Sequence, residues 1–177
     1  MKAQRGYVVV ITGEGKGKTT SALGMALRAV GHNFRVIMLQ FIKGSTRYGE
    51  LEAAKRLAPE FEIVQLGRGF VHVDPASPDP KDVATARAAW EVAKERILSG
   101  DYFMVVLDEI NNAIDYGLLP VGEVLEVLEK KPQGVTLVLT GRGADPRIIA
   151  AADLVSEVKE VKHPYREGQK ARKGIEY

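Results

Sequence analysis

The sequence has 177 residues, of which 45% are hydrophobic, and this length and content suit one globular domain spanning residues 1–177. Its 25 basic and 23 acidic side chains give a formal net charge of +2, which is too balanced to indicate a nucleic-acid-binding surface. The chain has no cysteine, which excludes disulfides and thiol nucleophiles, and no apolar run approaches the ~18 residues of a membrane span, so we expect a cytoplasmic protein without a membrane segment.

Short apolar runs that suit buried parallel strands alternate with helix-patterned segments along the chain. The expected strands are residues 7–12, 34–40, 61–66, 102–108, 135–140 and 154–161. The expected helices are residues 19–30, 49–58, 80–98, 121–130 and 146–152. This alternation predicts an α/β fold, with a doubly wound, mostly parallel sheet of about six strands and helices on both faces.

The first strand runs directly into three alternating glycines and a lysine, in the stretch YVVVITGEGKGKTT of residues 7–20. Glycines allow the backbone to turn successive N–H groups inward, and the start of a helix adds further N–H groups that favour an anion. The first glycine comes one residue later than in the usual phosphate loop, so this is a tightened variant of it. We expect the triphosphate of a nucleotide to be bound here, by Gly13, Glu14, Gly15, Lys16, Gly17, Lys18, Thr19 and Thr20.

Polar residues also follow the later strands, whose carboxyl ends meet the phosphate loop at one edge of the sheet. Asp108 and Glu109 end the fourth strand, where they could hold a metal ion or simply stabilise the start of a helix. Arg142 lies between two glycines after the fifth strand and could approach a phosphate or stay solvated. By composition alone, the basic, turn-rich residues 161–177 read as a solvated tail.

A series of motifs resembles the ATP:corrinoid adenosyltransferase family of the CobA type, from about Gly6 to Tyr177. The motifs are TGEGKGKTTSALGMALRAVGH, VIMLQFIKG, YGELE, VVLDEINNAIDYGLL, VTLVLTGRGA, ADLVSEVKEVKHPY and KARKGIEY. The resemblance implies a P-loop nucleotide-binding fold and a homodimer. It also implies an enzyme that transfers the 5′-deoxyadenosyl group of MgATP to the cobalt of a reduced corrinoid and releases triphosphate. Electrons would come from a separate protein, for which a flavoprotein reductase is the candidate.

The resemblance also suggests roles for individual residues. Lys18, Thr19 and Glu109 would be the catalytic residues, Arg28 would be a further phosphate contact, and Arg142 and His163 would lie near the nucleotide. The metal, Mg²⁺ or Mn²⁺, would be held by Thr19, Asp108 and Glu109. Family members carry Gly-Phe-Thr-Trp in the loop after the third strand, and its aromatic pair packs under the corrin ring. This chain has Gly-Phe-Val-His there, so Phe70 and His72 are the expected corrinoid-loop residues and the tryptophan is replaced.

Two other classes of function use the same residues. A P-loop ATPase or kinase would transfer a phosphoryl group and leave ADP. A regulator that binds a corrinoid or a nucleotide without catalysis would keep the loop, and the missing tryptophan is the sequence feature that points toward it.

Overall fold

The computed structural model describes residues 5–44, 48–69 and 77–177 of the chain. Its elements are β1 (Val8–Thr12), α1 (Lys18–Val30), β2 (Val36–Gln40), α2 (Gly49–Arg56), β3 (Phe61–Gln65), α3 (Pro80–Leu98), β4 (Met104–Asp108), α4 (Ile110–Asp115), α5 (Val121–Lys130), β5 (Thr136–Thr140), α6 (Pro146–Ala151), β6 (Leu154–Glu157) and a 3₁₀ turn, η1 (Pro164–Glu167). The predicted strands and helices are all present.

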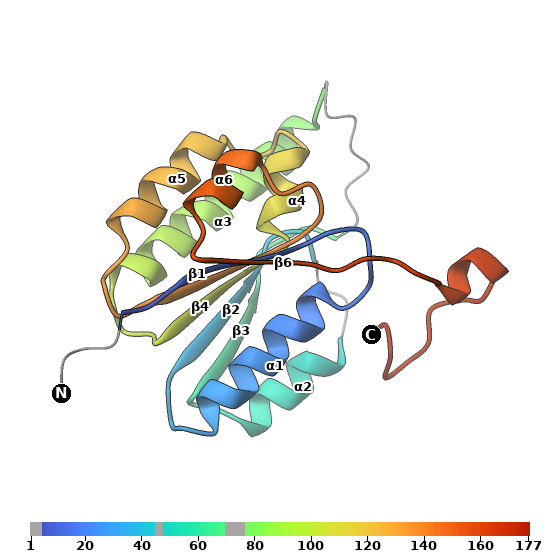
Figure 1. The fold of residues 1–177 in the computed structure, drawn as a ribbon, viewed down its shortest axis with the longest axis horizontal. Coiled ribbons are helices and arrows are strands. Elements are labelled where there is room, and N and C mark those ends of the chain that lie inside the picture. Colours follow the sequence, from blue (N-terminus) through green and yellow to red (C-terminus); the bar gives the residue numbers. More distant parts are fainter. Residues whose placement is uncertain (1–4, 45–47, 70–76) are drawn as a thin grey trace.

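The six strands form one parallel sheet in the order β3-β2-β4-β5-β1-β6. Helices α3, α4, α5 and α6 lie on one face, and α1 and α2 lie on the other (Figure 1). This is the doubly wound α/β architecture that the sequence predicts. The carboxyl ends of all strands point to the same edge, which carries the phosphate loop and the residues that follow the other strands.

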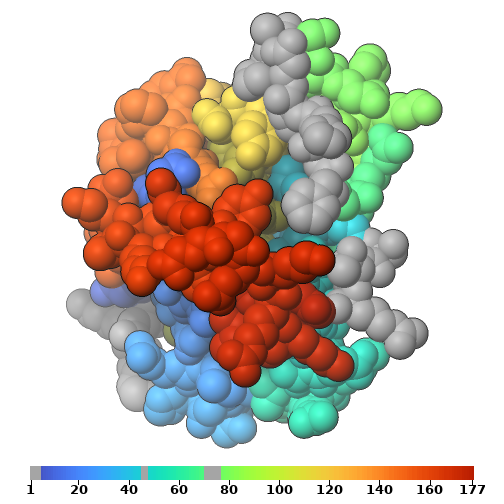
Figure 2. Space-filling model, turned by 90° about the vertical axis from the view of Figure 1, so that its right-hand side faces the viewer, coloured from blue at the N-terminus to red at the C-terminus, as the bar shows by residue number. Residues whose placement is uncertain are grey.

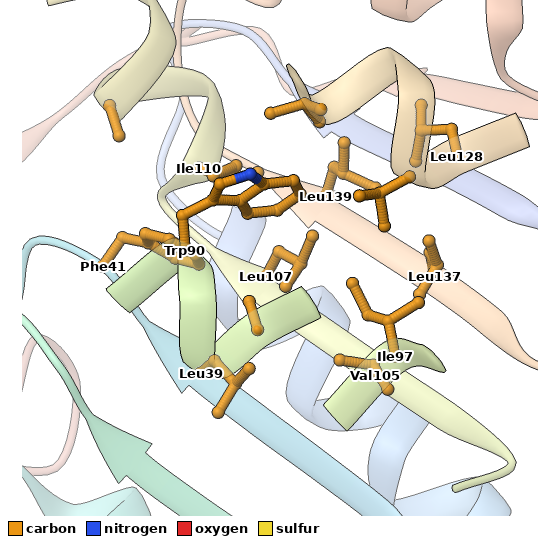
Figure 3. Packing of buried hydrophobic residues seen from close by; sticks show 14 of the residues in the cluster. Leu39, Phe41, Trp90, Ile97, Val105, Leu107, Ile110, Leu128, Leu137 and Leu139 are labelled. Carbon is orange, nitrogen blue, oxygen red and sulfur yellow. The ribbon is translucent and has the colours of Figure 1, made fainter. Parts of the chain in front are cut away.

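Both faces of the four inner strands, β2, β4, β5 and β1, are buried because alternate residues of each strand pack against different helix layers. In β1, Val8 and Val10 belong to the cluster that contains Trp90 of α3, whereas Val9 and Ile11 belong to the cluster on the α1 and α2 side. Figure 3 shows Trp90 among the side chains of the central strands. The continuous apolar runs seen in the sequence are therefore those of strands with no solvent-facing side.

Local signals set several helix boundaries. Asp79 and Asp145 accept hydrogen bonds from the N–H groups of Lys81 and Arg147, at 2.7 and 2.8 Å, and so cap the starts of α3 and α6. α1 ends at Val30, as predicted from the glycine that follows it. Among the described residues, no helix is long and apolar enough to cross a membrane.

Some boundaries differ from the prediction. α2 ends at Arg56, two residues early, and β6 covers Leu154–Glu157 rather than residues 154–161. The chain leaves the sheet after β6 and continues as an extended segment that crosses the carboxyl edge, where Figure 2 shows it in red. The short helix α4 was not predicted, because six residues with two asparagines show no helical periodicity.

Candidate functional site

The phosphate loop connects β1 to α1 and lies against the backbone that leaves β6. The N–H of Gly15 donates to the carbonyl oxygen of Val158 at 2.7 Å. A Cβ atom at Gly13 would lie 2.6 Å from that oxygen, and one at Gly15 would lie 2.7 Å from the carbonyl carbon of Lys159. Close backbone packing therefore requires both glycines, whereas Gly17 is required by its φ of +122°.

Lys18 begins α1 and folds back over the loop. Its Nζ donates to the carbonyl oxygens of Gly13 and Gly15, at 2.6 and 2.8 Å. Burial, and then the positive charge of Arg142, lowers the pKa of Lys18. An ammonium group has three donors, so one remains for an anion in the loop. The residue before it, Gly17, supplies no side-chain cap, which leaves the first N–H groups of α1 open to the same anion.

Asp108 is the centre of a buried hydrogen-bond network behind the loop. Its Oδ1 accepts from the hydroxyls of Thr19 and Thr140, both at 2.8 Å. Its Oδ2 accepts from Nε2 of Gln40 at 3.2 Å and lies 3.3 Å from Nζ of Lys43. The side chain is fully buried. Asp108 therefore positions its neighbours, and the Thr19 hydroxyl, whose proton points to Asp108, keeps its lone pairs for a metal ion.

Glu109 follows in a left-handed conformation, with φ 65° and ψ 20°. Its N–H donates to the hydroxyl oxygen of Thr140 at 2.9 Å, so β5 fixes the turn in which it lies. Burial, and then the charge of Asp108, raises the pKa of Glu109 to about 7. This strained, partly buried carboxyl is close to its protonation midpoint at neutral pH, and a divalent cation would favour its charged form.

Arg142 comes from the turn after β5, which is tied to α4. The backbone N–H of Arg142 donates to Oδ1 of Asn112 at 3.1 Å, and its side-chain Nε lies 3.2 Å from Oε2 of Glu14 in the phosphate loop. A Cβ at the preceding Gly141 would lie 2.5 Å from the same Asn112 oxygen. The glycine-flanked turn thus places the guanidinium beside the loop.

Two cavities adjoin the phosphate loop. The main cavity, of about 750 Å³, is lined at one end by residues 16–20, Glu109 and Arg142, and it continues along a trough between α1 and α2. The second cavity, of about 540 Å³, shares Lys16, Lys18 and Arg142 with the first and is also lined by His163. Lys16, Lys18 and Arg142 therefore lie between the two cavities and line both of them.

The structure does not bring every predicted site residue to this place. Arg28 is exposed in the last turn of α1, ten residues beyond Lys18, and it lines neither cavity. Since an α-helix rises about 1.5 Å per residue, Arg28 lies roughly 15 Å from the loop within its own chain. His163 lines the second cavity and accepts at Nδ1 from the N–H of Tyr165, at 3.2 Å. Phe70 and His72 lie outside the described residues.

Sequence reasoning missed several members of the site. Gln40 and Thr140 complete the network around Asp108, and each is the last residue of its strand. A polar residue at the end of an otherwise apolar strand could have indicated these members, because β2, β4 and β5 each end in one. Composition alone predicted a solvated tail, and Ile175 and Tyr177 are indeed 61% and 45% exposed, but residues 174–177 also line the main cavity, which composition did not indicate.

Comparisons with known proteins show the family of this chain. The family model described as "ATP:corrinoid adenosyltransferase BtuR/CobO/CobP" matches residues 4–177. Three proteins named corrinoid adenosyltransferase each match 98% of this chain: 41% identity over 85% of the protein from Pseudomonas aeruginosa, 42% over 81% of that from a Sinorhizobium species, and 40% over 87% of that from Escherichia coli K12. In structure, the chain matches 75% of a KaiC-like protein from Pyrococcus horikoshii OT3 over 89% of its own length, with a TM-score of 0.49 and 15% identity.

Proposed function

The chain belongs to the ATP:corrinoid adenosyltransferase family, whose enzymes transfer the adenosyl group of ATP to a corrinoid, and we propose that its phosphate loop holds the triphosphate that leaves in this reaction. The observation that carries the proposal is the loop itself, with Lys18 folded across it and Thr19 bonded to Asp108. Family membership decides between the alternatives left by the sequence, in favour of adenosyl transfer over phosphoryl transfer or regulation.

The chemistry asks this protein for placement and charge rather than for a nucleophile. Reduced cobalt, Co(I), attacks the C5′ carbon of the ribose, so the Co–C bond forms while the bond from C5′ to the α-phosphate oxygen breaks. Triphosphate leaves with the electron pair, and its growing negative charge meets the N–H groups at the start of α1, Lys18 and Arg142. Fixed donors of this kind lower a barrier because they need no reorganisation when charge develops.

We propose that the metal ion, Mg²⁺ or Mn²⁺, is held by Thr19 and Glu109 together with phosphate oxygens, while Asp108 acts through Thr19. The donors are hard oxygens, and Mg²⁺ usually combines one or two protein ligands with phosphates and water. The described residues contain no cluster of three His, Asp or Glu side chains that would bind a metal alone, which fits an ion that arrives with the nucleotide. When bound, the ion would offset the charge of the leaving triphosphate.

Glu109→Gln tests this metal site, because it removes the charge and keeps the shape. Adenosylation should slow at limiting Mg²⁺ and recover in part when Mg²⁺ is raised. Glu123→Gln, on the exposed side of α5 and ion-paired to Arg87, is the matched control and should keep the wild-type metal dependence. If Glu109→Gln has the wild-type metal dependence as well, Glu109 is only a residue at the start of α4.

We also propose a homodimer. β6 is an edge strand that pairs with β1 alone among the described strands, and its Leu154 and Val155 are 50% and 41% exposed, while Val161 beyond it is 90% exposed. An unpaired sheet edge with exposed apolar side chains is a surface on which a second chain can pack. Sedimentation should give a dimer for the wild-type chain, a monomer for Val155→Glu, and a dimer for the control Leu98→Glu at the end of α3. A wild-type monomer at micromolar concentration would contradict the proposal.

Two corrinoid-side proposals rest on the family alone. We propose that Phe70 packs under the corrin ring with His72 in place of the usual tryptophan, and that a flavoprotein reductase in the cytoplasm supplies the electrons. In the family, the aromatic pair under the ring helps to displace the lower axial ligand of the cobalt, and we propose this role for Phe70. Phe70→Ala should then slow adenosylation more for a corrinoid with an attached lower ligand than for cobinamide, which has none. Equal slowing of both would mean that Phe70 displaces no ligand.

A further inference from the structure

The last residues of the sequence form part of the wall of the main cavity. Gly174, Ile175, Glu176 and Tyr177 line it together with the phosphate loop and the trough between α1 and α2. Figure 2 shows this end of the chain, in the darkest red, where α1 in blue and α2 in teal meet. We infer that Ile175 and Tyr177 bind the nucleoside part of ATP, with the Tyr177 ring against the purine; this rests on the family's use of ATP as a substrate.

Residues 172–177 form a closed turn, which we call the 172–177 turn. The N–H groups of Ile175 and Glu176 donate to the carbonyl oxygen of Arg172, at 3.1 and 2.8 Å, and the N–H of Gly174 donates to a carbonyl oxygen of Tyr177 at 2.8 Å. Oε2 of Glu176 accepts from the N–H of Arg172 at 2.6 Å. These bonds hold the Ile175 and Tyr177 side chains on a folded support.

The turn is also connected to the phosphate loop. Oε1 of Glu176 lies 4.0 Å from Nζ of Lys16, a residue between two glycines of the loop. An ion pair at this distance is weak, but it brings the turn beside the residues that receive the triphosphate. A nucleotide anchored in the loop would therefore have the turn as its neighbour.

The polarity of the main cavity changes from one end to the other. Lys16 and Lys18 mark the cationic end, whereas Leu27 of α1, Ile175 and Tyr177 present apolar surface that is 59%, 61% and 45% exposed. Its volume lies within the range of about 300–1,000 Å³ that is usual for small-ligand sites. ATP has the same two ends, an anionic triphosphate and a planar base, so the base is expected on the apolar side.

The second cavity offers less apolar surface. Apart from the cations it shares with the main cavity, its side chains are Glu14, Glu160, His163, Tyr165 and Arg166, so its aromatic rings stand among charged groups and no aliphatic side chain of the described residues lines it. The main cavity combines aliphatic with aromatic side chains, and stacking with apolar contact is what holds a base without sequence-specific hydrogen bonds. The main cavity is thus the better place for the nucleoside, and the 172–177 turn adds Tyr177 to its wall.

Calorimetry with two ligands tests the assignment. Tyr177→Ala should weaken the binding of ATP about tenfold, the effect of losing one stacked base, and leave the affinity for inorganic triphosphate unchanged. Tyr177→Phe should bind ATP like the wild-type protein. Tyr7→Ala is the matched control, because Tyr7 is similarly exposed, at 53%, and directly precedes β1, at the amino end of the strand and away from the loop that follows its carboxyl end. Equal weakening of both ligands, or weakening of neither, would overturn the inference.

Fluorescence gives a second readout. Tyr177→Trp should show emission that ATP quenches and triphosphate does not, above the constant signal of Trp90, which is 1% exposed. An unchanged emission, or a variant that loses corrinoid affinity and keeps ATP affinity, would contradict nucleoside binding by the turn. Lys18→Ala separates this inference from the proposed triphosphate site, because it should weaken triphosphate binding whatever the turn does.

Discussion

Thr140 gives the strongest test of the network that shapes the site. Its hydroxyl donates its single proton to Oδ1 of Asp108 at 2.8 Å and accepts the N–H of Glu109 at 2.9 Å. The side chain is fully buried, so water cannot replace either bond. Thr140→Val keeps the shape of the side chain and removes both hydrogen bonds.

The magnitude follows from the two groups left behind. A lost hydrogen bond to a buried carboxylate costs about 1.5–3 kcal/mol, and an unpaired buried N–H costs about 1–3 kcal/mol. The added methyl group offsets part of this, so we expect Thr140→Val to lower the free energy of unfolding by about 3 kcal/mol. Thr140→Ser keeps the hydroxyl, loses one methyl group, and should cost about 1 kcal/mol.

Urea denaturation followed by circular dichroism measures both variants, and steady-state kinetics should show a raised KM for MgATP in Thr140→Val, because Asp108 and Glu109 are no longer held together. Thr140→Val that is as stable as the wild type, or more stable than Thr140→Ser, would refute the network as drawn.

Three further outcomes are expected. Lys18→Ala should weaken MgATP binding by about 1.5–3 kcal/mol and abolish transfer, and unchanged affinity in calorimetry would remove Lys18 from the site. Gly13→Ala should destabilise the fold and disrupt nucleotide binding, since its Cβ would lie 2.6 Å from the Val158 oxygen, whereas Gly24→Ala in open space on α1 should stabilise by about 1 kcal/mol. The pKa of Glu109 is raised from its ordinary value of 4.5 to about 7, so the folded state holds the proton more tightly and metal-free stability should fall as pH rises from 4.5 through 7, by at most about 3 kcal/mol. Glu109→Gln should remove that slope, and an equal slope in both proteins would assign it to another group.

The phosphate loop and the sheet could be predicted because their signals are local. Gly13, Gly15 and Lys18 are neighbours in sequence, and the buried strands are continuous apolar runs. The reason for Gly15 could not be predicted, because it is the backbone of Lys159, far along the chain, that leaves no room for a side chain. The sequence therefore identified Gly15 as a residue of the loop, but not the close packing against Lys159 that excludes a side chain there.

The network around Asp108 depends on strand order, which the sequence leaves open. Only when β4 lies between β2 and β5 do Gln40 and Thr140 come to either side of Asp108. The position of the 172–177 turn depends even more on the three-dimensional path of the chain. Its polar composition resembles a solvated tail, and the route of the chain after β6 is what brings Tyr177 to the cavity. For Arg28 the difference runs in the opposite direction: the family resemblance suggests a phosphate contact, but Arg28 lies in the last turn of α1 and lines neither cavity beside the loop of its own chain.

The products of turnover show most clearly whether the phosphate loop holds a leaving triphosphate. With ATP, Mg²⁺ and chemically reduced cob(I)alamin, phosphorus NMR should show intact triphosphate, in an amount equal to the adenosylcobalamin formed. This follows because attack at C5′ releases all three phosphates together, as a loop that holds the whole triphosphate requires. ADP and orthophosphate, produced whether or not the corrinoid is present, would instead mean that a P–O bond breaks and would contradict the role assigned to the loop.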